Sequence, residues 1–190
     1  IMYPIIRRRL VLVVAAAIMA VSLPASATEA DGRGPFVDTD GSMFEGSVAA
    51  IWAADITAGC EPWYFCPEAT VTREEMAAFL TRALGLTVPA TVRFTDTAES
   101  LFTGEIEAIA DAGITAGCGD RLFCPDDPVT RAQMASFFAR AFDLPASAEN
   151  PFVDDDSSVH AADIAAIAAA GITMGCGPER YCPEDPVTRD

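Results

Sequence analysis

The sequence predicts a mainly α-helical protein built from three tandem helix–loop–helix repeats of about 58 residues. Three observations predict this fold class: cysteines recur at a constant interval, apolar residues recur at helical spacing within each interval, and the same short segments surround both. Self-similarity at a fixed interval of this length indicates an array of supersecondary units. We therefore expect the function to belong to three copies of one small unit acting together. The two cysteine sets, each spaced by 58 residues, are Cys60, Cys118 and Cys176, and Cys66, Cys124 and Cys182.

The first 27 residues have the pattern of an export signal. Three arginines at residues 7–9 precede a short apolar run, and Ala-Ser-Ala at residues 25–27 is a small-x-small cleavage site. The run is too short to span a membrane comfortably, and the cleavage site disfavours a retained anchor helix. We predict cleavage after Ala27, a linker over residues 28–35, and a secreted chain with no stable membrane span after cleavage.

The chain is strongly acidic, with 28 Asp and Glu residues against 12 basic residues and a net charge of −16. All the basic residues are arginines. Nucleic-acid binding needs a basic face that contacts phosphates, so this composition argues against nucleic acid as a partner. The charge fits an exposed extracytoplasmic protein and identifies no particular ligand.

Alignment at the 58-residue interval divides the chain into repeats over residues 36–86, 94–144 and 152–190. Each repeat opens with a Phe-x-Asp segment, after which a polar stretch and a first helix are expected. The second repeat predicts this helix from Phe102 to Ala112, because Ile106 and Ile109 are spaced for one helical face. By the same count the third repeat is expected to be truncated before its second helix. The matching apolar pairs of the other repeats are Val48 with Ile51 and Ile164 with Ile167.

Glycines mark the expected end of the first helix. Gly113 and Gly171 stand where a residue in the left-handed conformation commonly ends a helix, and an isoleucine follows each of them to close the cap. The first repeat has Asp55 at this position, and an aspartate takes the left-handed conformation less readily than glycine.

The second helix of each repeat is expected to begin at a threonine. Thr72 with Glu75, and Thr130 with Gln133, match the capping box, in which each side chain accepts a backbone N–H of the helix start. An amphipathic apolar pattern follows both threonines. Two such helices bury little apolar surface alone, so packing between repeats is expected to supply the core. The apolar positions are Met76, Phe79, Leu80, Ala83 and Leu84, and Met134, Phe137, Phe138, Ala141 and Phe142.

The six cysteines predict three local disulfides, 60–66, 118–124 and 176–182. An even number of cysteines in an exported chain is typical of a disulfide framework, and the repeat favours this pairing over the other connectivities. The alternative is metal binding, but zinc sites usually show closer cysteine pairs with histidine, and the only histidine, His160, is remote in sequence. We therefore expect structural bridges that pin the loop between the two helices, and no metal site.

No catalytic set stands out in the sequence. Serine, histidine and aspartate show no recurring arrangement, and acidic residues are too abundant for carboxylate pairs to identify a glycosidase. We therefore predict a protein that is not an enzyme and needs no cofactor. The acidic segments at residues 38–42 and 154–156 are interpreted as solvated loops, with weak calcium binding as the alternative.

The order of these segments resembles the S-layer homology domain. The resemblance rests on Phe-x-Asp, a first helix, Gly-Ile-x-x-Gly, aromatic-x-Pro, and Val-Thr-Arg-x-Glu/Gln opening an apolar helix, and it covers residues 36–190. It implies three units packed with pseudo-threefold symmetry and ligand grooves between them. It also implies non-covalent attachment to the bacterial cell envelope through a secondary cell-wall polysaccharide, often one bearing a ketal-linked pyruvate.

The resemblance assigns glycan binding to the Thr-Arg element at the start of each second helix. An arginine at a helix N-terminus can hold a carboxylate through two hydrogen bonds, which suits a pyruvyl group. The alternative is that each arginine only pairs with a nearby acidic residue on the repeat surface. The assigned residues are Thr72, Arg73 and Glu75, Thr130, Arg131 and Gln133, and Thr188 and Arg189.

The chain departs from the usual family pattern in two places. Its cysteines stand where other members carry different residues, which indicates a disulfide-stapled variant. The frequent His-Trp-Ala near the first helix is replaced by Phe44, Phe102 and His160 in the three repeats. These departures leave the exact glycan open.

The sequence as a whole predicts a secreted, non-catalytic module of the cell wall or S-layer that binds a cell-envelope glycan. Two alternatives remain. The chain could be the targeting region of a longer exported enzyme, such as a protease or wall hydrolase, or of another attached cargo domain. It could also be a surface repeat that binds proteins, as adhesins do.

Overall fold

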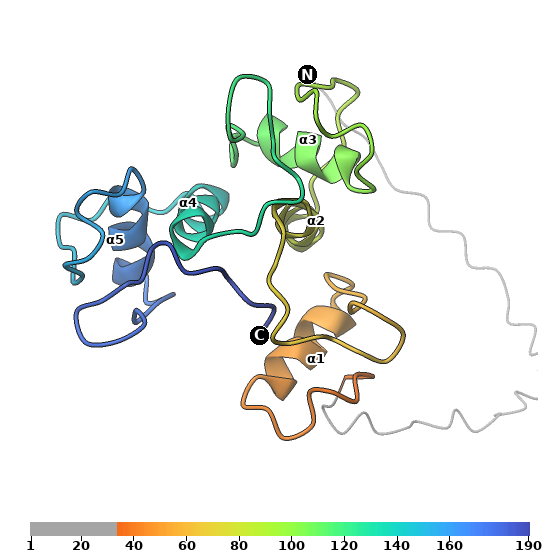
Figure 1. The fold of residues 1–190 in the computed structure, drawn as a ribbon, viewed down its shortest axis with the longest axis horizontal. Coiled ribbons are helices and arrows are strands. Elements are labelled where there is room, and N and C mark those ends of the chain that lie inside the picture. Colours follow the sequence, from red (N-terminus) through yellow and green to blue (C-terminus); the bar gives the residue numbers. More distant parts are fainter. Residues whose placement is uncertain (1–33) are drawn as a thin grey trace, which may run out of the picture. The chain divides into compact units, whose positions relative to one another are not determined.

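A computed structural model describes residues 34–190, so the predicted export signal lies outside the described residues. Within this range the fold is all helix and loop, with only isolated β-bridges and no strand (Figure 1). This confirms the mainly α fold class. The helices are α1 Glu45–Ala53, α2 Arg73–Leu84, α3 Thr103–Asp111, α4 Arg131–Ala141 and α5 Ala161–Ala169. None of them is long and apolar enough to cross a membrane.

The second helices, α2 and α4, begin at the expected threonines. At α2 the capping box is complete, because Thr72 and Glu75 each accept a backbone N–H from the other residue. At α4 only half of it forms: Thr130 accepts the N–H of Gln133 at 3.3 Å, while the side-chain oxygen of Gln133 accepts from Arg73 at 3.4 Å. The predicted box at Thr130 is therefore wrong in its second half, because a long-range partner takes the amide.

The first helices, α1, α3 and α5, end in the left-handed conformation that the sequence indicates. Gly113 and Gly171 have φ of 74° and 72°, and Asp55 adopts the same conformation with φ of 57°. The isoleucine after each of these residues donates its N–H back to the last turn of the helix at 2.9 Å. The chain therefore turns away from the first helix at the same point in every repeat.

The helices pack across repeat boundaries. Helix α2 of the first repeat packs on α3 of the second, and α4 of the second packs on α5 of the third (Figure 1). Apolar residues of both partners share one core in each case, which agrees with the expectation that neighbouring repeats supply the core. The α2–α3 core includes Met76, Leu80, Ile106, Ile109 and Phe137, and the α4–α5 core includes Ala132, Ala135, Ile164 and Ile167.

A closed ring of backbone hydrogen bonds joins the three repeats. The N–H of Val71 donates to the carbonyl of Val187, that of Val187 to Val129, and that of Val129 to Val71, each at 2.9 Å. Val71 and Val129 are buried, and each valine directly precedes a Thr-Arg element. The ring gives the repeats a cyclic, pseudo-threefold relationship, because each makes the same contact to the next.

Each repeat carries one of the predicted disulfides. Cys60 is bonded to Cys66, and the other two repeats contain the corresponding bridges, with Cα–Cα distances of 6.0 to 6.1 Å. No cysteine among the described residues is free. The pairing 60–66, 118–124 and 176–182 is confirmed.

Candidate functional site

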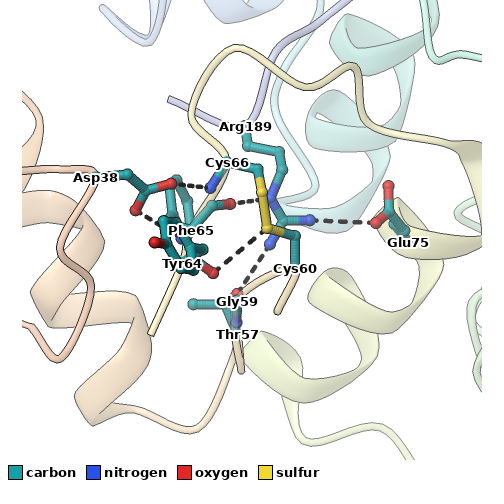
Figure 2. Close-up of a disulfide and its surroundings, with 9 residues drawn as sticks. All are labelled: Asp38, Thr57, Gly59, Cys60, Tyr64, Phe65, Cys66, Glu75 and Arg189. Atoms are coloured by element: carbon teal, nitrogen blue, oxygen red, sulfur yellow. Dashed lines mark hydrogen bonds and ion pairs between the residues drawn. A yellow bond between two sulfur atoms is a disulfide. The ribbon is translucent and has the colours of Figure 1, made fainter. Parts of the chain in front are cut away.

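The aspartate of each Phe-x-Asp segment holds the disulfide loop of its own repeat. The two carboxylate oxygens of Asp38 accept the N–H groups of Phe65 and Cys66 at 2.8 and 2.7 Å (Figure 2). Asp96 and Asp154 hold the equivalent pairs in their repeats. All three aspartates are loop anchors, so the interpretation of Asp38 and Asp154 as parts of solvated loops was wrong. The recurrence of an aspartate at the same position of every repeat was the sequence signal that could have indicated this structural role.

Those hydrogen bonds also set the acidity of the three carboxyl groups. For Asp38, partial burial raises the pKa, but the N–H donors of Phe65 and Cys66 outweigh it and the pKa lies below its usual value. Asp96 behaves in the same way. At Asp154 the backbone N–H of Tyr181 is the main reason why the pKa is lowered. All three groups are therefore carboxylates at neutral pH.

The disulfide loop depends on one glycine in each repeat. Gly117 has φ of 88°, and a Cβ at this position would clash with the carbonyl oxygen of Leu122 and lie 2.7 Å from the ring of Phe94. Gly59 and Gly175 are constrained in the same way. Only glycine therefore fits where the loop passes the Phe-x-Asp phenylalanine.

The three arginines of the Thr-Arg elements bind the disulfide loop of another repeat. The Nε of Arg73 donates to the carbonyl of Phe123 at 2.7 Å, and its guanidinium stacks 4.7 Å from the centre of the Phe123 ring. Arg131 holds Tyr181 and Arg189 holds Phe65 in the same way. The carbonyl that each arginine holds belongs to a residue whose N–H is held by a loop-anchoring aspartate. Each loop is therefore clamped from both sides.

The threonines of the Thr-Arg elements have structural contacts and do not line a groove. Thr72 and Thr130 cap α2 and α4, so their hydroxyl groups accept helix N–H groups. Thr188 is exposed and forms a β-bridge with Thr70. These residues position the arginines that follow them, and none of the three lines the grooves described next.

Two grooves lie between repeats at positions related by the 58-residue interval. One groove is lined by the loop after α1, by α2, by the residue before α3 and by an arginine of the third repeat. The other is lined by the loop after α3, by α4, by the residue before α5 and by an arginine of the first repeat. We name them the Gln133 groove, about 320 Å³, and the Glu75 groove, about 140 Å³. The Gln133 groove is lined by Arg73, Thr115, Ala116, Gly117, Cys118, Gln133, Ser136, Phe137, Arg140 and His160. The Glu75 groove is lined by Thr57, Ala58, Gly59, Glu75, Ala78, Phe79, Arg82, Phe102 and Arg189.

In the Glu75 groove each nitrogen of the Arg189 guanidinium has a hydrogen-bond partner. One Nη contacts a carboxylate oxygen of Glu75 at 3.2 Å and the other donates to the hydroxyl of Thr57 at 3.3 Å (Figure 2). The side chain of Arg189 is 3% exposed. Burial lowers its pKa, and the carboxylates of Glu75 and Asp38 oppose that shift.

In the Gln133 groove the guanidinium of Arg73 is only partly engaged. One Nη donates to the neutral amide of Gln133 at 3.4 Å. The other, Nη2, is buried and has no hydrogen-bond partner within residues 34–190. Arg73 is 4% exposed. Burial lowers its pKa, which Asp127 and Asp96 oppose.

Polar side chains from α4 and from the start of α5 extend the Gln133 groove. The hydroxyl of Ser136 lies 2.7 Å from Nδ1 of His160 and also donates to Asp163. Arg140 lies 3.7 Å from Asp163 and donates to the carbonyl of Ile114 at 3.3 Å. Sequence reasoning missed Ser136 and Arg140 as groove residues. The matching positions of Arg82 and Arg140 in the repeat were the available signal.

Of the residues assigned from sequence, the structure brings four into the grooves. Arg73 and Gln133 meet in one, and Arg189 and Glu75 in the other. In each pair the arginine comes from one repeat and its partner from the next in the ring. Arg131 makes the same loop contact but lines neither groove.

Comparison with known proteins identifies the family that one segment of the chain matches. Residues 93–135 match the S-layer homology domain, a segment that includes α3, the second disulfide loop and the first turn of α4. This segment of the chain is an S-layer homology domain. The resemblance seen in the repeated motifs is therefore confirmed, and S-layer homology domains generally serve as cell-wall anchoring modules.

Two relatives are similar to part of the chain. An endoglucanase of Bacillus sp. (strain KSM-635) is 32% identical over 94 residues, which are 49% of this chain and 10% of the relative. The S-layer protein EA1 of Bacillus anthracis is 31% identical over 88 residues, 45% of this chain and 10% of the relative. The matches thus span about a tenth of each relative, and one of the two is an enzyme by name.

Proposed function

We propose that this chain is a non-catalytic module that anchors to the cell wall by binding an anionic wall polysaccharide in its inter-repeat grooves. The observation that carries the proposal is the guanidinium of Arg73. It is 4% exposed, lines a groove of about 320 Å³, and retains a buried N–H donor that is unpartnered among the described residues. A buried unsatisfied donor is costly, and an acceptor entering the groove would relieve that cost.

A carboxylate is the acceptor that this geometry favours. A guanidinium binds a carboxylate through charge-assisted hydrogen bonds, which are about twice as strong as neutral ones. Arg140 adds a second cation to the same groove. Although the chain has a net charge of −16, the field inside the groove is local, so an acidic protein can bind an anionic polymer there. A glycan bearing a ketal-linked pyruvate has the required carboxylate.

The remaining groove residues suit the sugar that carries the carboxylate. Thr115, Ser136 and His160 offer hydroxyl and imidazole groups to sugar hydroxyls. Thr72, Thr130 and Thr188 act in this proposal by placing the arginines at the correct point in the ring. Arg131 holds the corresponding loop and is proposed to serve the corresponding groove.

Binding to isolated cell-wall sacculi tests the proposal. The protein should sediment with intact sacculi, remain in solution with sacculi from which the secondary polymer has been extracted, and be released by the purified soluble polymer. Equal sedimentation with extracted sacculi, or no effect of the soluble polymer, would contradict glycan anchoring. Binding that only a surface protein competes would support an adhesin-like role in its place.

A second candidate is that the chain anchors a longer exported enzyme. The relative from Bacillus sp. (strain KSM-635) is named an endoglucanase, and only 10% of it matches this chain. In that case the module would bind the wall while a separate catalytic domain acts on substrate at the cell surface. Sequencing the surrounding gene distinguishes the two: an adjoining catalytic domain in frame supports the enzyme, and its absence supports a dedicated anchoring protein.

A further inference from the structure

The two grooves occupy equivalent places in the repeat but differ in chemistry at three of their lining positions. Glu75 of one groove is Gln133 in the other, Ala78 is Ser136, and Phe102 is His160. Each groove also contains the arginine of a Thr-Arg element from the preceding repeat in the ring. This arginine is Arg189 in the Glu75 groove and Arg73 in the Gln133 groove. The same positions of the repeat therefore line both grooves, while the charge and polarity of three of them change.

The replacement of glutamate by glutamine alters the charge next to the buried arginine. Glu75 contacts Arg189 at 3.2 Å and supplies a built-in carboxylate, whereas Gln133 contacts Arg73 at 3.4 Å through a neutral amide. An anionic ligand entering the Glu75 groove must share its arginine with a fixed negative charge. Repulsion between two carboxylates at hydrogen-bonding range weakens binding in a partly buried site.

The free hydrogen-bonding capacity of the two arginines also differs. The second Nη of Arg189 donates to Thr57 at 3.3 Å. The hydroxyls of Thr57 and Thr115 both accept a backbone N–H, that of Gly59 at 3.2 Å and that of Gly117 at 3.1 Å. Only the hydroxyl of Thr57 also accepts from an arginine, and Nη2 of Arg73 is left without an acceptor among the described residues. A ligand in the Gln133 groove thus gains a hydrogen bond without breaking one.

The polarity of the surrounding side chains also differs between the two grooves. In the Gln133 groove Arg140 and His160 lie beside Asp163, which Arg140 and Ser136 contact. In the Glu75 groove Arg82 stacks 5.7 Å from the ring of Phe102, an apolar residue at the position of His160. The first groove presents polar groups to a ligand, and the second presents an aromatic ring.

We propose that the two grooves are unequal, with the Gln133 groove the primary site for a carboxylate-bearing sugar and the Glu75 groove a weaker site. The identity of the residue at positions 75 and 133 sets this order. The inference rests on the proposed function and deepens it, because it assigns the anionic ligand to one groove. It also means that exchanging two side chains should move the primary site from one repeat boundary to the other.

The test is a titration of the whole protein with a defined ligand. The probe is methyl glucopyranoside carrying a 4,6-linked pyruvate ketal, and its methyl ester is the uncharged control. Isothermal titration calorimetry gives the number of tight sites and their affinities for the wild type, Gln133→Glu, Glu75→Gln and the double exchange. These variants are matched, because each places in one groove the residue that the other groove already accommodates.

The wild type should show one tight site that prefers the free acid. Gln133→Glu should weaken that site by about tenfold or more, a ratio typical of losing one charge-assisted contact. Glu75→Gln should raise the number of tight sites to two, and the double exchange should restore one. Thermal melts should confirm that all four proteins are folded.

Each other outcome contradicts a specific statement. Two equal sites in the wild type, or an unchanged affinity in Gln133→Glu, would overturn the inequality of the grooves and leave wall anchoring intact. Equal binding of acid and ester would overturn carboxylate recognition in the Gln133 groove. If no variant binds the probe and the protein also fails to bind intact sacculi, the proposed function itself is overturned.

Discussion

The guanidinium of Arg73 donates to the carbonyl oxygen of Phe123 across 2.7 Å, although fifty residues separate them. This bond crosses from one repeat to the next, and Arg131 with Tyr181 and Arg189 with Phe65 repeat it around the ring. The same arginines point their terminal nitrogens toward a groove where one is present. In Arg73, one side of the guanidinium therefore holds the fold and Nη2 is available for a ligand, so substitution of this arginine affects both.

Arg73→Ala should lower the free energy of unfolding by about 2 to 4 kcal/mol, because it leaves a buried carbonyl unpaired and removes packing on an aromatic ring. Urea denaturation at neutral pH measures the change. Arg180→Ala is the control: Arg180 is exposed and its side chain contacts Asp154 at 3.5 Å in a surface ion pair, so the substitution should cost less than about 1 kcal/mol. Equal losses in the two variants would show that the contact with Phe123 contributes little.

Gly117→Ala should be strongly destabilising, by about 2 kcal/mol or more, because a Cβ there meets a backbone carbonyl and an aromatic ring. The variant Gly113→Ala is the control that separates the cost of the left-handed backbone conformation from the cost of a steric clash. Gly113 also has a positive φ, 74°, but has open space around it, so only the cost of the left-handed conformation, about 1 to 2 kcal/mol, is expected. The urea midpoints of the two variants measure both losses of stability. A smaller loss of stability for Gly117→Ala than for Gly113→Ala would contradict the predicted clash.

Removal of one disulfide should destabilise the protein modestly. The bridges span a sequence separation of 6, and closing so small a ring contributes about 2 kcal/mol by chain entropy. The double variant Cys118→Ser with Cys124→Ser should therefore remain folded with a lower melting temperature, measured by circular dichroism. Treatment of this variant and the wild type with reductant provides the control. A double variant as stable as the wild type would mean that the clamp of Arg73 and Asp96 suffices for the loop.

Stability should fall in acid because of the loop-anchoring aspartates. The pKa values of Asp38, Asp96 and Asp154 are lowered in the folded protein, so their contribution is complete above the unfolded pKa of about 4 and is lost as the pH falls through the folded values. Urea denaturation between pH 7 and pH 2.5 measures this loss. Asp96→Asn should lower the free energy of unfolding at pH 7, and the further loss of stability between pH 7 and pH 2.5, the acid limb of the pH profile, should be smaller than in the wild type. An acid limb identical to that of the wild type would contradict the role of Asp96.

Local features of the fold were predictable from the sequence because each depends on residues close together in the chain. The N-cap at Thr72 needs Glu75 three residues later, and the left-handed helix end at Gly113 needs only the glycine itself. The disulfides needed the repeat as well, because its constant interval singles out one pairing among several. The helical pattern of the apolar residues similarly predicted α2 and α4.

Long-range relationships within the candidate site were not predictable in the same way. The motif marked Arg73 as important but could not show that its Nε holds a carbonyl fifty residues away. The same holds for Gln133, whose side chain fits a capping box in sequence but accepts from Arg73 in the structure. In both cases a partner from another repeat competes with the local one, and the sequence does not contain the position of that partner.

The sequence by itself determined the repeat, the helices and the disulfide pairs, because these follow from periodicity and short-range chemistry, and its motifs carried the resemblance to the S-layer homology domain. Only the tertiary structure decided how the repeats are joined, through the hydrogen-bonded ring of Val71, Val129 and Val187. That ring brings an arginine of one repeat against the second helix of another, and so pairs Arg73 with Gln133 and Arg189 with Glu75. The physical reason is that a groove between repeats is defined by groups far apart in the chain, whose meeting depends on packing.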